Sequence, residues 1–259
     1  MISFGGPAGT GRYDCGTNAV MDNIDAGTIM WWCRNQDSTP TTTGTVIDKG
    51  DATHRWRIRN LTGGNINFIR DRATTDLTCE VAHASFANYP GDGNLVFYAV
   101  SWDVALTNTD QHWYCGSGQL APAEATAYAT QIVGSGATQS NAGATLFVGN
   151  DAGLVNAYHA HLGPMAVFNR QLSLAEIRSW WRDPRKLDAN CVALWQNKVL
   201  NVQSADYSGN GNNAQPTGLT YETGFRIWTY KRGIRAQIPA VAGPPGTGGL
   251  PLLFFTRDV

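Results

Sequence analysis

Charged residues are scarce in this chain of 259 residues, at 15% of the sequence, and they nearly cancel to a net charge of −1. Without a basic excess, no long-range field draws the protein to nucleic acid or to an anionic membrane. The sequence also lacks an apolar run of about 18 residues, the length of a membrane-spanning helix, and a basic-plus-apolar leader after Met1. We therefore expect folding in a cytoplasm, with no nucleic-acid partner and no membrane insertion.

Paired cysteines are also missing. The five cysteines are odd in number, widely spread and without a CxxC pair, which argues against a disulfide framework and against a zinc site. We expect them to be small, reduced, buried side chains, although spacing alone leaves a single disulfide open. The sequence contains no Gly-x-Ser-x-Gly elbow, phosphate-binding loop or metalloprotease helix, so nucleophilic and nucleotide chemistry are unsupported.

Glycine and aromatic residues are abundant, and they predict an all-β fold. The chain has 29 glycines and nine tryptophans, a balance that suits short strands joined by tight turns. Short apolar or alternating runs separated by turn residues predict strands at residues 28–34, 54–60, 65–70, 95–102, 111–115, 145–149, 161–168 and 191–195. Because residues 95–102 are apolar on both faces, that strand is predicted to be central and covered on both sides.

One short helix is predicted near residues 173–182. Ser173 and Glu176 form a capping box at its start, and Leu174, Ile177 and Trp181 form one apolar stripe. Asp183 and the proline that follows it end the helix.

The last part of the chain has a different composition. Residues 239–251 are mostly Pro, Gly and Ala, which predicts an extended segment. The end is apolar and needs a partner surface; its bulky residues are Leu250, Leu252, Leu253, Phe254 and Phe255. We therefore divide the chain into a domain at 1–237 and a C-terminal arm at 238–259, and we expect the arm to dock on a neighbouring subunit.

Three segments carry a resemblance to a known superfamily: residues 27–33 (GTIMWWC), residues 167–177 (VFNRQLSLAEI) and residues 206–212 (DYSGNGN). Together they resemble the laminin G-like/concanavalin A-like lectin–glucanase superfamily over roughly residues 1–225. The resemblance implies a two-sheet antiparallel jelly-roll sandwich. The order of the parts is similar to domains in structural proteins of tailed bacteriophages.

That likeness implies a non-enzymatic virion component assembled in the host cytoplasm, either a capsid decoration protein or a tail-associated subunit. Its expected partners are the major capsid protein or another virion protein, and further copies of itself in a homo-oligomer. The alternative is a carbohydrate-binding module or adhesin that recognises host surface polysaccharide. The two roles are compatible in one protein.

Catalysis is a third, weaker reading. The glucanase branch of the superfamily carries two glutamates on one strand, which act as nucleophile and general acid. This chain has only Glu80, Glu124, Glu176 and Glu222, each more than 40 positions from the next. The family pattern is absent, so no catalytic residue is assigned and a degenerate glycosidase is the last hypothesis.

No metal or other cofactor is assigned either. His159 and His161 share a strand face, but without a nearby acidic residue or cysteine they are expected to be a surface hydrogen-bonding pair. Relatives in the superfamily often bind calcium, and residues 48–51 or 150–151 carry suitable oxygens. Asp and Asn are also ordinary turn formers, so calcium stays open.

Two sets of residues are candidates for contact with a carbohydrate or a partner. Arg55, Arg57 and Arg59 alternate with apolar residues, so a strand places all three on one face, as a docking row for an anionic glycan or an acidic capsid surface, or as a solvated face. Trp32 and Trp113 each belong to an aromatic pair that points to both faces of a strand. They are expected either to stack on a ligand or to lie in the core.

Overall fold

A computed structural model describes residues 2–3, 9–51, 53–105, 110–186, 190–196 and 203–219 of the chain. The chain separates into a unit of Met1–Phe225 and a unit of Arg226–Val259. The second unit, and with it the predicted arm at 238–259, lies outside the described residues. Docking through the arm therefore stays a prediction.

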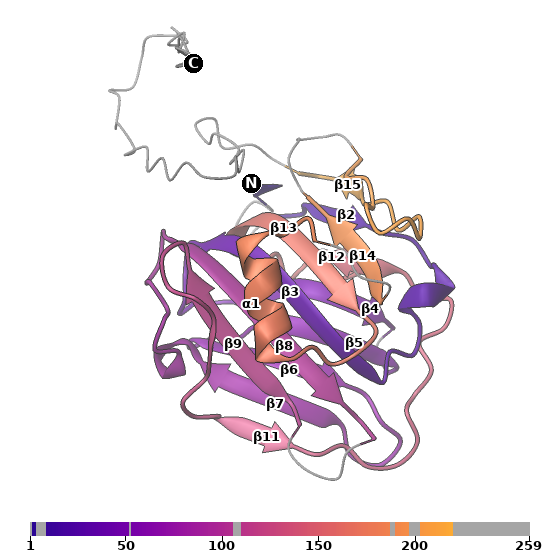
Figure 1. Cartoon of the computed structure of the whole chain (residues 1–259). Coiled ribbons are helices and arrows are strands. Elements are labelled where there is room, and N and C mark those ends of the chain that lie inside the picture. Colours follow the sequence, from indigo (N-terminus) through magenta and orange to yellow (C-terminus); the bar gives the residue numbers. More distant parts are fainter. Residues whose placement is uncertain are drawn as a thin grey trace, which may run out of the picture. The chain divides into compact units, whose positions relative to one another are not determined.

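Two antiparallel sheets form the first unit (Figure 1). The seven-stranded sheet has the order β1-β13-β3-β8-β9-β10, and β14 also pairs with β13. Its strands are β1 (Ile2–Ser3), β3 (Ala26–Asn35), β8 (Leu95–Asp103), β9 (His112–Ser117), β10 (Ala123–Glu124), β13 (Ala160–Phe168) and β14 (Cys191–Trp195). The predicted all-β jelly-roll sandwich is confirmed.

The eight-stranded sheet has the order β11-β7-β6-β5-β4-β12-β2-β15. Its strands are β2 (Arg12–Asp14), β4 (Gly44–Gly50), β5 (Arg55–Asn60), β6 (Asn65–Arg70), β7 (Leu77–Ala82), β11 (Thr130–Ile132), β12 (Leu146–Val148) and β15 (Gln215–Thr217). Two short 3-10 helices, η2 (Ala19–Met21) and η3 (His83–Ser85), lie in the connections. Each of the eight predicted strands has a counterpart, whereas β4, β7 and the short strands β1, β2, β10, β11 and β15 were not predicted.

The main core fills the space between the sheets. On β5, Trp56 and Ile58 have no exposed surface, and they pack with inward side chains of the other sheet such as Trp31 and Trp113. All five cysteines are buried and free, as the sequence predicts. Burial raises the pKa of Cys33 to about 12, so this thiol stays protonated.

Helix α1 (Leu174–Arg182) lies on the outer face of the seven-stranded sheet, across β3 and β8 (Figure 1). Ser173 is its N-cap and Glu176 completes the predicted capping box. Ile177 and Trp180 are buried in a second hydrophobic cluster with Met30 and Phe97 of the sheet, while Leu174 and Trp181 are only partly buried. The seven-stranded sheet is therefore covered on both faces.

Candidate functional site

The outer face of the eight-stranded sheet carries the predicted arginine row. Along β5, Arg55, Arg57 and Arg59 are half-buried and alternate with fully buried core residues. Since successive side chains of a strand point to opposite faces, all three arginines lie on the face that points away from the core. The row is confirmed as a structural feature, and its role stays a prediction.

The two strands next to β5 place one hydrogen-bond acceptor beside Arg57 and another beside Arg59. Asp48 of β4 is the cross-strand partner of Arg57, and Asn67 of β6 is the cross-strand partner of Arg59. Asp48 is 6% exposed and Asn67 is 3% exposed. We call Asp48, Arg55, Arg57, Arg59 and Asn67 the arginine face.

The hydrogen bonding of this face is incomplete. Within the described part of the chain, Arg57 and Arg59 make no hydrogen bond or ion pair, and the Nε atoms of both are buried. The Oδ1 atoms of Asp48 and Asn67 are also buried without a hydrogen-bond partner. Buried polar atoms are normally paired, so four unpaired groups on one surface make this face the candidate site.

Burial and charge crowding shift the pKa values of these groups. Burial raises the pKa of Asp48 to about 6, although Arg55 and Arg57 oppose the shift. Burial and the charges of Arg59 and Arg55 lower the pKa of Arg57 to about 10. Burial, and then the charge of Arg55, lower the pKa of Arg59. Burial is the main cause of both arginine shifts, because it disfavours the charged form of a guanidinium group.

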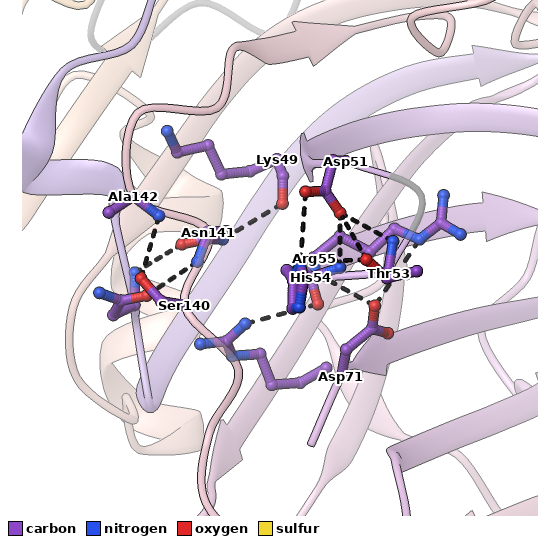
Figure 2. A network of polar contacts seen from close by, with 11 residues as sticks. Lys49, Asp51, Thr53, His54, Arg55, Asp71, Ser140, Asn141 and Ala142 are labelled. Atoms are coloured by element: carbon purple, nitrogen blue, oxygen red, sulfur yellow. Dashed lines mark hydrogen bonds and ion pairs between the residues drawn. The ribbon is translucent and has the colours of Figure 1, made fainter. Parts of the chain in front are cut away.

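The turn between β4 and β5 holds the start of the row in place (Figure 2). Oδ1 of Asp51 accepts the backbone N–H groups of Thr53 and His54, both at 2.8 Å. Asp71 accepts the backbone N–H of Arg55 at 3.1 Å and lies 3.8 Å from its Nε. Arg55 is therefore anchored to the protein, in contrast to Arg57 and Arg59.

A second anchored cation lies farther along the same sheet. Arg12 of β2 donates to the carbonyl oxygens of Asp151 at 3.1 Å and Ala152 at 2.9 Å. Its guanidinium carbon lies 4.1 Å from the centre of the Phe147 ring, a cation–π distance. Phe147 of β12 is in turn a cross-strand partner of Asp48, so an aromatic side chain borders the arginine face.

The tryptophans that the sequence suggested as contacts do not join this site. Trp113 has no exposed surface and its Nε1 donates to the Cys79 carbonyl at 3.1 Å, so the predicted surface contact is wrong for this residue. Trp32 lies on the other sheet, where its ring stacks on Trp181 of α1 at 6.4 Å between centroids. The sequence named Asp48 only as a possible calcium ligand and missed Asn67, because only strand pairing reveals that both lie beside the arginines.

The histidine pair also differs from its prediction. His159 and His161 are 4% and 3% exposed, so they are not surface residues. Nε2 of His159 lies 3.4 Å from Oγ1 of Thr42, and Nε2 of His161 lies 3.2 Å from Nε2 of Gln36. Burial lowers the pKa of His159.

Two of the suggested calcium ligands, Asn150 and Asp51, serve turns of their own, whereas Asp48 lies on β4 in the arginine face. Oδ1 of Asn150 accepts the backbone N–H groups of Asp151 at 2.9 Å and Asn156 at 3.0 Å, and Asp51 is engaged in the β4–β5 turn. Among the described residues, no group of three or more His, Cys, Asp or Glu side chains is arranged to hold a metal ion.

A shallow hollow of about 400 Å³ lies at the start of α1, bordered by His112, Tyr114 and Glu176. Its glutamate is already engaged, because Arg170 binds Oε1 at 2.7 Å and lowers the pKa of Glu176 to about 2. A glycosidase needs a general acid with a raised pKa. Glu176 is therefore unsuited to that role.

Comparisons with known proteins agree with the fold. No protein-family model matches the sequence, and no relative was found among curated proteins. A carbohydrate-binding protein candidate from Bacteroides ovatus has a similar structure, with a TM-score of 0.51, 10% identity and 85% of this chain covered. This chain spans 58% of the length of that protein.

Two further solved structures show weaker similarity. A pentraxin from Limulus polyphemus matches with a TM-score of 0.44 and 11% identity, over 69% of this chain and 80% of its own. The binding domain of botulinum neurotoxin serotype G matches with a TM-score of 0.40 and 12% identity, over 66% of this chain and 40% of its own. The part of the chain that the structure describes contains no helix long and apolar enough to cross a membrane. The strand order and the similarity to the Bacteroides ovatus protein agree on a two-sheet jelly-roll sandwich fold.

Proposed function

We propose that this chain is a non-catalytic carbohydrate-binding domain and that the arginine face is its ligand-binding surface. The observation that carries the proposal is the set of four unpaired polar groups of Arg57, Arg59, Asp48 and Asn67 on one sheet face. Guanidinium N–H groups donate to sugar oxygens, while carboxylate and amide oxygens accept from sugar hydroxyls. The similar fold of the Bacteroides ovatus protein supports the same class of ligand.

Retaining unpaired groups of this kind has a cost that a ligand offsets. A buried polar atom without a partner costs about 1–3 kcal/mol. Sugar hydroxyls and ring oxygens supply the missing partners.

Affinity electrophoresis in gels that contain neutral or acidic polysaccharides tests the proposal. The wild-type protein is expected to be retarded by at least one polysaccharide, and the double variant Arg57→Ala/Arg59→Ala to run unretarded. The matched control is Arg182→Ala/Arg185→Ala, which removes two exposed arginines at the end of α1. Equal losses in both double variants, or no retardation of the wild type, would contradict the proposal.

The role of a virion subunit is a second candidate, and it rests on the sequence of the arm. Its apolar end, with Phe254 and Phe255, follows a Pro/Gly-rich segment, and such a tail can dock on a neighbour with little loss of entropy. Homo-oligomer formation, virion partners and a virion location belong to this candidate. It is compatible with glycan binding by the sandwich.

A further inference from the structure

The two arginines without partners form a donor pair. Arg57 and Arg59 are two positions apart on β5, so their Cα atoms are about 6.5 Å apart along the strand on the same face. Two other cations on the outer face of this sheet are occupied, Arg55 at Asp71 and Arg12 at two carbonyl oxygens. The uncompensated positive charge is therefore concentrated at Arg57 and Arg59, which favours an anionic ligand.

The hydrogen-bond acceptors beside this pair restrict the class of ligand further. Asp48 lies directly across from Arg57, and Asn67 lies directly across from Arg59. Both side chains are more than nine-tenths buried and each has an unpaired Oδ1. These oxygens need hydroxyl groups as hydrogen-bond donors. A polyhydroxylated sugar supplies such donors well, whereas a simple inorganic anion at neutral pH supplies them poorly.

Neither a neutral sugar nor a bare anion satisfies the whole face. A neutral sugar leaves the two guanidinium groups without a counter-charge, and a bare anion is repelled by the Asp48 carboxylate. A sugar carboxylate combines a planar anion, which matches the fork of a guanidinium group, with free ring hydroxyls on the same residue. A sulfate ester instead consumes one of the hydroxyls that the acceptors need.

Asp48 is covered by its neighbours on the sheet. Phe147 and Arg57 lie directly across from it on its two sides, and their larger side chains limit its exposure to 6%. Arginine side chains are long and have many rotamers. Rotation of Arg57 toward an anion would uncover the carboxylate that receives the adjoining hydroxyls.

We infer that the ligand is an acidic polysaccharide of the uronic acid class, with one sugar carboxylate held between Arg57 and Arg59 and neighbouring hydroxyls donating to Asp48 and Asn67. The inference rests on the proposed function, because it names the ligand class of the same face. It requires no metal ion and no chemical step.

The probes are polygalacturonate, alginate and hyaluronan, each compared with its own carboxyl-reduced form in the presence of EDTA. Carboxyl reduction keeps the sugar backbone and removes only the charge. We expect the full-length protein to bind at least one uronate polymer about tenfold or more tightly than its reduced form. Equal binding of both forms would overturn the inference and leave the proposed function intact, whereas no binding to any polysaccharide would overturn both.

The variant Asp48→Asn distinguishes a site with defined sugar contacts from a surface patch that binds any polyanion. In a site with defined sugar contacts it replaces one of the two accepting carboxylate oxygens by a donating NH2 group and weakens uronate binding. In a polyanion patch it removes a repelling charge, so binding to uronates and to dextran sulfate would become tighter. Tighter binding by Asp48→Asn, together with equal or stronger binding of dextran sulfate by the wild type, would overturn the inference.

Discussion

Asp48, a residue of the proposed binding face, reduces the stability of the fold. Its carboxyl has an ordinary pKa of 3.8, and burial raises the pKa to about 6 in the folded chain. A shift of this size lowers the free energy of unfolding at neutral pH by on the order of 3 kcal/mol. Because the folded pKa is the higher one, this loss of stability is present above pH 6 and disappears as the pH falls toward 4.

Replacing Asp48 by Asn is therefore expected to stabilise the fold. The amide is still a buried polar group, so we expect the free energy of unfolding at pH 7 to rise by about 1–2 kcal/mol, less than the full electrostatic cost. Urea unfolding at pH 7 and at pH 4.5 measures the gain, which should shrink at the lower pH. A loss of stability at pH 7 would mean that the attraction of the three arginines outweighs burial.

Asp206 has the opposite role, since its carboxylate organises a turn. It accepts the backbone N–H groups of Leu194, Ser208 and Asn212, each at 2.9 Å. It also accepts the Ser208 hydroxyl at 2.8 Å and the Asn212 side-chain amide at 3.3 Å. The turn residues 206–212, which carried part of the family resemblance, thus have a structural function.

We expect Asp206→Ala to lower the free energy of unfolding by about 3 kcal/mol, because several donors lose their partner at once. Chemical denaturation of the variant gives this value. Asp76→Ala is the control, since Asp76 accepts one backbone N–H, from Arg72, at 2.9 Å. Similar losses in the two variants would argue against a special role for Asp206.

At the scale of elements, helix α1 and the arginine face lie on opposite outer faces of the sandwich. The helix packs on the seven-stranded sheet through Ile177 and Trp180. The arginine face belongs to the outer side of the eight-stranded sheet. Damage to the helix should therefore affect stability and leave ligand binding unchanged.

The variant Ile177→Ala tests this separation. Ile177 has no exposed surface, so its truncation should cost about 2–5 kcal/mol of stability. Polysaccharide retardation at a temperature where the variant is folded should equal that of the wild type. Ala175→Ser, on the exposed side of the helix, is the control. Weakened binding in Ile177→Ala alone would show that the two faces are coupled.

At the scale of the whole molecule, the two halves of the functional hypothesis lie in different parts of the chain. Glycan binding is assigned to the sandwich, and docking is assigned to the arm at 238–259. The mass in solution separates the two, because docking of an arm on a neighbouring copy produces an oligomer.

We expect a chain that stops after Gln237 to form an oligomer with fewer subunits than the full chain, and to lose co-sedimentation with candidate virions. Its polysaccharide binding should be unchanged, which provides the internal control. The same number of subunits and the same co-sedimentation for the two chains would contradict docking by the arm and leave glycan binding as the leading function.

Much of the fold could be predicted because its signals are local. Alternation of polar and apolar residues predicted β5 and placed its three arginines on one face. The spacing of Ser173 and Glu176 predicted the start of α1. By contrast, β4 was missed. If the segments on both sides of the turn at residues 51–54 are taken as strands, Asp48 lies opposite Arg57. The site was therefore predicted only in part.

The sequence by itself determined which side chains share a face, because the two-residue period of a strand and the cap of a helix depend only on neighbouring positions. Only the tertiary structure decided which faces are covered. Trp113 lies in the core between the sheets and Trp32 is partly covered by α1, whereas Arg57 and Arg59 remain on an outer face. The physical reason is that the covering layers come from residues far away in the chain, and strand pairing between β4, β5 and β6 brings Asp48 and Asn67 beside the arginines.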